Sequence, residues 1–275
     1  MMRSKRLLGT LIAVLTSTAL IGAPPVAAAA TTTTFAGTVA LSNCSGSVVK
    51  LAGAAQTDRA LVLSNGHCLE EGFLGNGEVI VNKPSQRTFS LLSANGKSTL
   101  GTLRATKIVY ATMTGTDTSL YQLNTTYAQL NQRYGIAALE LASAHPVAGK
   151  HIDVVSGYWK KIYSCSIDGF VNELHEGVWV WKDSIRYTPE CQTIGGTSGS
   201  PIVDNASLQI TGINNTLNEQ GQACTLDNPC EVNSDGSLTY TQGQNYGQET
   251  YWFTTCLTST NTIDLNKTGC LLTKP

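Results

Sequence analysis

The stretch that decides the fold is Gly195-Gly196-Thr197-Ser198-Gly199-Ser200-Pro201, which follows Cys191 and leads into an apolar, strand-like run. Glycine permits the positive φ values and the close approach to a ligand that a tight loop around one serine requires. If Ser198 is a nucleophile, the N–H groups of Gly196 and Ser198 can face the oxygen of a carbonyl under attack and form an oxyanion hole. A Gly/Ser surface turn before a strand is the alternative interpretation of these residues alone. The catalytic interpretation therefore needs a base, and a group that orients it, elsewhere in the chain.

The predicted base is His67, which ends a buried-looking strand in the run ALVLSNGHC at residues 60–68. A lone histidine is usually a surface residue or a satisfied one. His67, however, directly precedes Cys68, and a disulfide at that cysteine would fix the loop that carries the histidine. The other three histidines, His145, His151 and His175, have no comparable setting.

The predicted partner of the base is Asp117, which stands just before the alternating run TSLYQL at residues 118–123. Aspartate also favours turns that start strands, so a structural role is the alternative. Between His67 and Ser198, no other aspartate precedes such a strand at a comparable distance. The order along the chain is therefore His67, Asp117, Ser198.

The N-terminal residues predict secretion. Arg3, Lys5 and Arg6 precede an apolar run over residues 7–21 and then an Ala-rich segment, which is the pattern of a signal peptide over residues 1–30. A membrane anchor would need a longer apolar span and no small-residue cleavage site. We expect the mature chain to begin close to Thr31 and to be soluble. Without the signal it carries 15 basic and 19 acidic residues, a net charge too small to indicate nucleic acid or anionic membrane as a partner.

All eight cysteines lie in the predicted mature region, and an even count after a signal peptide indicates four disulfides. Eight cysteines allow 105 connectivities. Sequence order suggests that neighbours pair, as Cys44–Cys68, Cys165–Cys191, Cys224–Cys230 and Cys256–Cys270. Metal binding is the competing interpretation, but no Cys/His cluster has zinc-site spacing. The sequence predicts neither a metal site nor a cofactor.

The mature region is rich in Thr, Ser, Asn and Gly and has few long helical patterns, which favours an all-β protein of many short strands. Residues 127–142 have weaker strand character and include a crossing segment with some helix. Residues 161–168 and 250–256 are among the predicted strands, and residues 218–246 are predicted to form a long loop stapled by a small disulfide ring.

The three motifs SNGHC at 64–68, TDTSL at 116–120 and GGTSGSP at 195–201 resemble, in that order, the chymotrypsin/trypsin superfamily of serine peptidases. Within it the chain is most similar to bacterial secreted trypsin-like enzymes, including glutamyl-endopeptidase-like ones. The resemblance implies two six-stranded antiparallel β-barrels with the active site in the cleft between them. It places the first barrel at residues 35–130 and the second at residues 131–275, which include the disulfide-stapled loop and a C-terminal tail.

The resemblance also implies a secreted serine endopeptidase with His67, Asp117 and Ser198 as its catalytic triad. The Cys44–Cys68 pair matches the family's histidine-loop disulfide. In trypsin-type zymogens an aspartate precedes the serine and pairs with the newly cut N-terminus. Thr197 stands there and cannot form that ion pair, so a preformed oxyanion loop is the simpler expectation.

Four residues are expected to bind substrate by their position relative to Ser198: Gln192 and Thr193 near the base and wall of the specificity pocket, and Asn214 and Asn215 in the strand that pairs with substrate. A neutral Gln192 offers no carboxylate to attract Arg or Lys. Glutamyl-specific relatives carry a histidine where Asn214 falls. These residues predict a neutral or broad preference.

Two alternatives of other classes stay open at this stage: an esterase that uses the same triad on small esters, and a catalytically inactive binding homologue with the same fold. An intact triad argues against the second. The expected partners are polypeptide substrates and, further, protein inhibitors. The protein is predicted to be a monomer that binds neither nucleic acid nor membrane.

Overall fold

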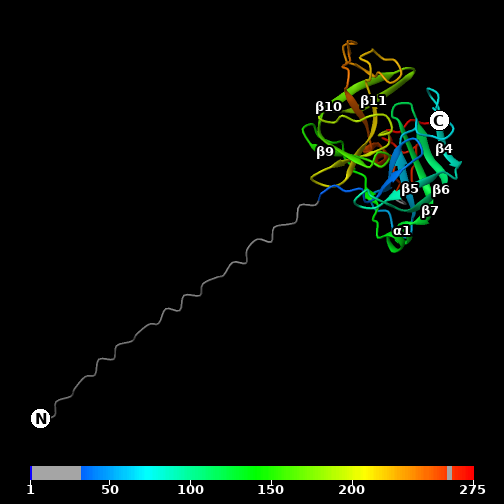
Figure 1. The fold of residues 1–275 in the computed structure, drawn as a ribbon, viewed down its shortest axis with the longest axis vertical. Coiled ribbons are helices and arrows are strands. Elements are labelled where there is room, and N and C mark those ends of the chain that lie inside the picture. Colours follow the sequence, from blue (N-terminus) through cyan, green and yellow to red (C-terminus); the bar gives the residue numbers. More distant parts are fainter. Residues whose placement is uncertain (2–31, 259–261) are drawn as a thin grey trace. The chain divides into compact units, whose positions relative to one another are not determined.

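The computed structural model describes residue 1 and residues 32–258 and 262–275 (Figure 1). The predicted signal peptide and cleavage site lie outside the described residues. Residues 32–275 form one compact unit. Among the described helices, none has both the length and the apolar character needed to cross a bilayer.

The first sheet closes into a barrel of six antiparallel strands in the order β1-β5-β6-β7-β3-β2, because β1 also pairs with β2. Alternating apolar residues of these strands fill its interior. Two further strands extend the sheet: β4 pairs with β6, and β8 runs parallel to β2. The strands are β1 (Thr38–Ala40), β2 (Ser45–Lys50), β3 (Arg59–Ser64), β4 (Val79–Pro84), β5 (Thr88–Leu92), β6 (Thr99–Thr112), β7 (Thr118–Thr126) and β8 (Leu139–Glu140).

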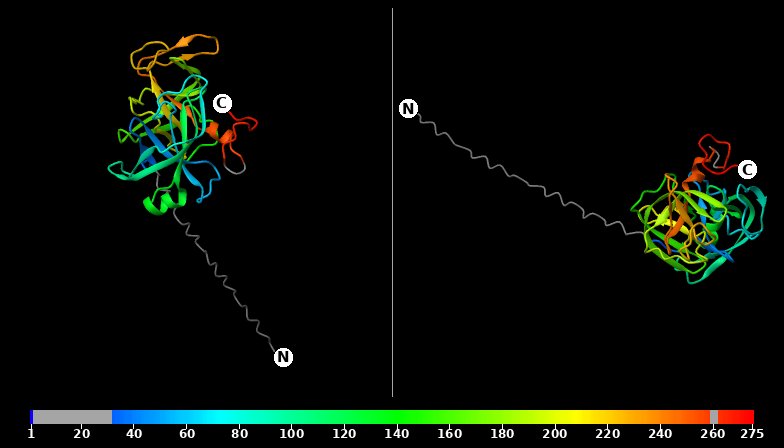
Figure 2. Two further views of the ribbon diagram at one scale, coloured as in Figure 1. Left: turned by 90° about the vertical axis from the view of Figure 1, so that its right-hand side faces the viewer. Right: turned by 90° about the horizontal axis from the view of Figure 1, so that it is seen from above.

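The second sheet closes in the same way, in the order β10-β11-β16-β13-β12-β9, because β9 and β11 both pair with β10. Strands β14 and β15 continue from β10 outside the ring and project from the second barrel (orange in Figure 2). The strands are β9 (His151–Ser156), β10 (Lys161–Glu176), β11 (Trp179–Tyr187), β12 (Pro201–Asp204), β13 (Ile210–Leu217), β14 (Cys230–Val232), β15 (Leu238–Thr239) and β16 (Asn245–Glu249). The prediction of two six-stranded antiparallel barrels is confirmed.

Helix α1 (Tyr127–Tyr134) follows the first barrel and confirms the prediction of some helix within residues 127–142. Its first turn is closed by a capping box in which Thr126 and Gln129 exchange side-chain to backbone hydrogen bonds. It ends at Gly135, whose φ of 67° is the left-handed conformation typical of a helix C-terminus.

The predicted strand over residues 250–256 is wrong, because residues Tyr251–Thr255 form helix α2. Their aromatic and β-branched composition favours a strand locally. Tertiary packing overrides this preference, since α2 buries Trp252 and Phe253 against residues of both barrels. The strand of this region is β16, which lies partly inside the predicted long loop. Residues 262–275 then return to the first barrel, where Tyr110 donates a hydrogen bond to the carbonyl of Thr273.

The hairpin of β10 and β11 reaches from the second barrel to the first. Two indole N–H groups near its tip donate hydrogen bonds across the gap, Trp179 to the carbonyl of Leu74 and Trp181 to the carbonyl of Met113, at 2.8 and 2.9 Å. The first-barrel loops that receive these bonds adjoin His67 and Asp117 in sequence. The hairpin therefore forms one wall of the space beside them.

Four disulfides cross-link the structure, Cys44–Cys68, Cys165–Cys191, Cys224–Cys230 and Cys256–Cys270, and no described cysteine is free. The first holds the loop after β3 to the start of β2. The second ties β10 to the segment that leads to the Ser198 loop.

Candidate active site

His67 lies in the turn that follows β3, beside the Cys44–Cys68 disulfide. Only glycine fits before it, because a Cβ on Gly66 would come within 2.2 Å of the carbonyl oxygen of Thr112. The side chain of His67 is 20% exposed, so one edge of the imidazole remains open to the cleft. Burial opposes protonation of the ring, but the Asp117 carboxylate outweighs it, so the pKa of His67 is raised above its ordinary value.

Asp117 is fully buried in the loop before β7, and all of its described hydrogen bonds go to the histidine turn. Its Oδ1 accepts from the backbone N–H groups of Gly66 and His67 at 2.6 and 3.0 Å. Its Oδ2 lies 2.6 Å from His67 Nδ1. Asn65 completes the link by donating its side-chain amide to the Asp117 carbonyl at 2.8 Å. Since a carboxylate accepts but does not donate, Nδ1 carries the proton and Nε2 is left as an acceptor.

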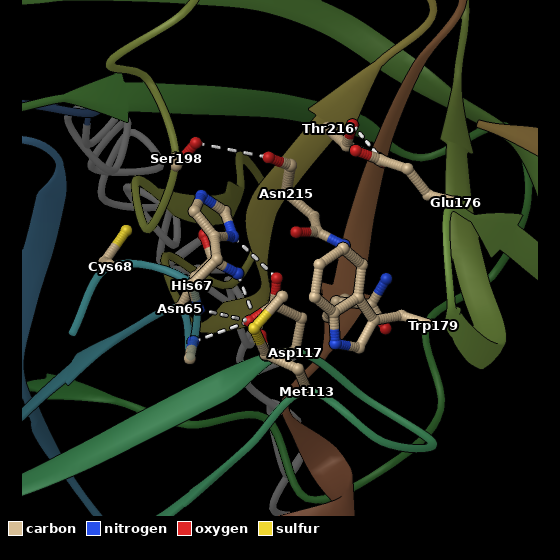
Figure 3. Close-up of polar contacts among 12 residues, drawn as sticks. Asn65, His67, Cys68, Met113, Asp117, Glu176, Trp179, Ser198, Asn215 and Thr216 are labelled. Carbon is tan, nitrogen blue, oxygen red and sulfur yellow. Dashed lines mark hydrogen bonds and ion pairs between the residues drawn. The ribbon is translucent and has the colours of Figure 1, made fainter. Parts of the chain in front are cut away.

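Ser198 lies on the other side of the imidazole, and Figure 3 shows the His67 ring between Asp117 and Ser198. The hydroxyl of Ser198 donates to the carbonyl of Asn215 at 3.3 Å, and the described hydrogen bonds include none from it to His67. A rotation about the serine side chain would be needed to bring its hydroxyl into a hydrogen bond with His67.

The backbone around Ser198 is held from both sides. The carbonyl of Ser198 accepts from Ser45 N–H at 2.8 Å, and Gly199 N–H donates to the carbonyl of Asn214 at 2.9 Å. Gly199 adopts a φ of 75°, and a Cβ there would lie 2.2 Å from the carbonyl oxygen of Ser45. Glycine is therefore required at this position by conformation and by space.

The N–H groups of Gly196 and Ser198, like that of Gly195, donate to no described residue. The C=O and N–H groups of one trans peptide point in opposite directions. The Gly195 carbonyl is held by the indole N–H of Trp159 at 2.8 Å, so the N–H of Gly196 points away from Trp159. The Thr197 carbonyl accepts from Ser200 N–H at 3.1 Å, which fixes the N–H of Ser198 in the same manner.

Thr197 closes this loop with its own hydrogen bonds. Both its N–H and its hydroxyl donate to the carbonyl of Ile194, and its hydroxyl accepts from the side-chain amide of Asn214 at 3.0 Å. These bonds lie within the second barrel, and among the described residues the side chain of Thr197 is held by neutral groups alone.

The cleft that holds the three predicted triad residues also exposes aromatic and acidic groups. Phe73 packs edge-on against both His67 and Trp179, with ring centroids 6.0 and 5.5 Å apart. Besides Asp117, the acidic members of the lining are Glu176, Glu219 and Asp227. The cleft is therefore anionic along the wall formed by the hairpin tip and the loop after β13.

Glu176, at the end of β10, is the acidic residue that the structure fixes most firmly (Figure 3). Its carboxylate accepts from the hydroxyl of Thr216 at 2.6 Å and from the backbone N–H of Asp227 at 2.9 Å. Burial raises the pKa of Glu176 to about 7, despite these two hydrogen bonds.

The four predicted substrate-binding residues fall in different places. Asn214 and Asn215 line the cleft, and the side-chain amide of Asn215 is buried without a hydrogen-bond partner among the described residues. Gln192 is exposed, and Thr193 is buried with its hydroxyl on the side chain of Asn245; neither is among the residues that line this cleft.

Sequence reasoning missed Trp159 and Glu176, which contact the loop and the cleft from the second barrel. No local signal marks either residue. Trp159 is an exposed aromatic residue after β9, and Glu176 lies beyond the point where the predicted strand ends.

The sequence matches the model of the trypsin-like peptidase domain over residues 44–213, more than half of the chain. The chain therefore belongs to the trypsin-like peptidase family. Comparison with curated proteins gave no match.

Similarity to solved structures is remote. The MamO protease domain from Magnetospirillum magneticum in its apo form is 12% identical, with 79% of this chain and 93% of that chain covered and a TM-score of 0.49. The thermostable serine protease AL20 from an extremophilic microorganism is 16% identical, with 79% and 91% covered and a TM-score of 0.45. A Glu endopeptidase in complex with MPD is 13% identical, with 78% and 85% covered and a TM-score of 0.41.

Proposed function

We propose that this protein is a serine endopeptidase that hydrolyses peptide bonds through an acyl-enzyme intermediate. Family membership supports peptidase function in general. The observation that carries the specific proposal is the contact between His67 Nδ1 and a fully buried carboxylate oxygen of Asp117 at 2.6 Å, in the same cleft as Ser198. That contact leaves Nε2 free to accept a proton on the side of the ring where the serine lies.

In the proposed reaction, His67 takes the hydroxyl proton of Ser198 as the oxygen attacks the substrate carbonyl, and later gives it to the leaving amine. Asp117 keeps the imidazole in the required tautomer and stabilises the imidazolium that forms. Water then attacks the acyl carbonyl, with His67 again as base, and the acyl group is released from Ser198.

The free N–H groups of Gly196 and Ser198 are proposed to stabilise the oxyanion. Removing one such donor typically costs about 10²–10³-fold in kcat. Both groups are already oriented, that of Gly196 by the bond from Trp159 to the Gly195 carbonyl and that of Ser198 by a bond within the loop, so the hole would need no reorganisation when charge develops on the substrate oxygen.

Secretion is part of the proposal. Four disulfides in one chain are typical of proteins that fold in an oxidising compartment. The signal-like pattern over residues 1–30 supports the same conclusion. Polypeptides outside the cell would then be the substrates.

The test is covalent labelling of the purified protein with a fluorophosphonate, followed by cleavage of a peptide library. Ser198→Ala should abolish labelling and lower kcat/KM on peptides by several orders of magnitude, with an unchanged circular dichroism spectrum. Ser200→Ala is the matched control, because the buried Ser200 hydroxyl has no hydrogen-bond partner among the described residues. It should keep both labelling and activity.

The outcomes separate the alternatives. Labelling of Ser198 with hydrolysis of small esters but of no peptide would indicate an esterase. A folded protein that neither reacts with the probe nor hydrolyses either substrate would be an inactive homologue, and the proposed function would be wrong.

A further inference from the structure

A second cluster of ionisable groups lies outside the cleft and has no part in the proposed reaction. His145 belongs to the connection between β8 and β9, Asp183 to β11, and Glu249 to the end of β16. One nitrogen of the histidine and one carboxylate oxygen of each acid lie within 4.8 Å of one another. Three segments far apart in the sequence thus bring three ligand-type atoms to one point.

Glu249 is the unusual member, because its side chain is only 1% exposed. Neither of its buried carboxylate oxygens accepts a hydrogen bond from any described residue. Its nearest basic neighbour is His145 Nε2, 3.3 Å from Oε1. A buried carboxylate without hydrogen-bond donors is costly, so a cation or a proton must compensate it.

His145 directs its Nε2 at both acids. Its Nδ1 lies 2.6 Å from the carbonyl oxygen of Pro146, which can only accept, so Nδ1 carries the proton. In the neutral imidazole, Nε2 then has no proton, yet it lies 3.2 Å from Asp183 Oδ1 and 3.3 Å from Glu249 Oε1. Metal-binding histidines commonly donate their second ring N–H to a backbone carbonyl in this manner.

The groups around the cluster hold its atoms in place. Tyr251 donates its hydroxyl to Asp183 Oδ2 at 3.1 Å, which leaves Oδ1 directed at the cluster. The His145 ring packs against Phe170, with ring centroids 4.2 Å apart. Asp183 itself has a φ of 56°, a conformation that is unfavourable for a residue other than glycine. Local strain of this kind persists where surrounding contacts over-determine it, and functional sites are a common setting.

We propose that His145, Asp183 and Glu249 bind a divalent transition-metal ion, and that zinc is the ion they fit. One imidazole nitrogen and two carboxylate oxygens are ordinary zinc ligands, at about 2.0–2.2 Å from the metal. In a tetrahedral site such bonds place neighbouring ligand atoms about 3.3–3.5 Å apart. The 3.2 and 3.3 Å separations of His145 Nε2 from the two carboxylates match this spacing. Calcium and magnesium prefer oxygen ligands throughout, so the imidazole disfavours them.

The fourth ligand would be water. The side chains of His145 and Asp183 are 38% and 31% exposed, so the site opens to solvent on the side opposite Glu249. Bound zinc would join the connection between the barrels to two strands of the second barrel. Because only the folded chain brings the three ligands together, zinc would raise the temperature of unfolding.

The test uses the complete secreted protein, treated with EDTA, dialysed and titrated with ZnSO₄ in a calorimeter. We expect one zinc per chain and a higher melting temperature in its presence. Co²⁺ in place of Zn²⁺ should give the visible absorption of a four-coordinate ion. Glu249→Gln and His145→Gln should each weaken zinc binding at least tenfold, and neither should give the Co²⁺ spectrum.

Two controls separate this site from others. His151→Gln removes an exposed histidine whose Nδ1 lies 3.0 Å from the Ser166 hydroxyl, outside the cluster, and should bind zinc like the unaltered protein. His67→Ala should do the same, which would show that zinc is not bound in the catalytic cleft. Circular dichroism checks that each variant folds. If Glu249→Gln fails to fold, zinc binding by His145→Gln tests the proposal alone, because the partly exposed His145 side chain can be replaced without burying a new group.

The proposal is wrong if the unaltered protein binds no zinc below millimolar concentration, since Glu249 would then be a buried neutral acid. It is equally wrong if both site variants bind zinc as tightly as the unaltered protein. Neither outcome bears on Ser198, whose labelling tests the proposed peptidase function separately.

Discussion

Trp159→Phe tests whether the proposed oxyanion hole is preformed by a hydrogen bond from outside the loop. The indole N–H of Trp159 donates to the carbonyl of Gly195 at 2.8 Å and so directs the N–H of Gly196 away from itself. Phenylalanine keeps most of the aromatic contact with Gly196 but cannot donate. The peptide between Gly195 and Gly196 then loses one of the interactions that hold its orientation.

The expected loss follows from the free energy of one hydrogen bond. A neutral hydrogen bond contributes about 0.5–1.5 kcal/mol net, and 1.4 kcal/mol corresponds to about a tenfold change in an equilibrium constant. We therefore expect kcat/KM to fall about 3–10-fold. Complete removal of an oxyanion donor would lower kcat about 10²–10³-fold, so the loss in Trp159→Phe should be much smaller than that. KM should change little, because the oxyanion forms only after substrate is bound.

The assay is steady-state hydrolysis of one peptide substrate, together with inhibition by a peptide aldehyde whose adduct carries the oxyanion. Aldehyde affinity should fall by the same factor as kcat/KM. Tyr158→Phe is the matched control, since Tyr158 flanks Gly196 from the same side but its hydroxyl makes no hydrogen bond to a described residue. Equal losses in the two variants, or full activity in Trp159→Phe, would refute the assigned role of the indole.

Four further predictions follow from the site and its supports. Replacing Cys44 and Cys68 together by Ala should lower the free energy of unfolding by about 3 kcal/mol, because the disulfide joins residues 24 positions apart. Guanidinium denaturation measures this loss, and peptidase activity should fall in the same variant. Asp117→Asn should lower kcat about 10⁴-fold. It should also move the acid limb of the pH profile of kcat/KM to lower pH, because the carboxylate that raises the pKa of His67 is lost while activity needs the neutral ring. Gly199→Ala should destabilise by at least about 3 kcal/mol, whereas Gly236→Ala, with a similar φ of 81° but open space, should cost only about 1–2 kcal/mol in the same melts. Because the cleft wall is anionic, peptides with Lys on the N-terminal side of the scissile bond should be cleaved faster than matched peptides with Glu. The ratio of their kcat/KM values should shrink as pH falls through about 7, where Glu176 gains a proton. The same pH dependence of this ratio in Glu176→Gln would contradict the prediction.

The residues predicted to carry the chemistry were accessible from the sequence because each sits in a short local motif. A strand that ends in Gly-His-Cys and a serine among glycines are constrained by their immediate neighbours. A Cβ at Gly66 would strike the Thr112 carbonyl, and one at Gly199 would strike the Ser45 carbonyl. Sequence reasoning therefore finds these positions without knowledge of the fold.

The ends of long strands were less predictable. The predicted strand over residues 161–168 continues to Glu176 in the structure, because the pairing of β10 with β11 shifts register between Ile167 and Gly169 and then resumes. A bulge of this kind absorbs an interruption of the alternating pattern. The pattern after Asp168 therefore indicates an end where the chain only bends. As a consequence the hairpin tip, with Glu176, was not expected in the cleft.

Side chains that act through contacts between distant segments were not predictable at all. Trp159 reaches Gly195 across 36 residues of sequence, and His145 reaches Asp183 across 38. Each is an ordinary surface residue by local pattern. Their roles depend on which strands the barrel places side by side, and the sequence carries no local trace of that.

The strands that carry two of the proposed zinc ligands also support the loop of Asp117 through their other face. Asp183 and Glu249 belong to the cluster around His145, while their neighbours Ser184 and Gln248 are buried on the other face, as alternation along a strand requires. Gln248 donates to the Ser184 hydroxyl at 3.0 Å, and its carbonyl oxygen lies 3.5 Å from the hydroxyl of Thr116, which directly precedes Asp117 in the chain. A cation bound on one face would thus restrain the strands that support the Asp117 loop from the other. Because it would contact neither the predicted triad nor the Ser198 loop, its effect should fall on the stability of the barrel and not on the proposed chemical step.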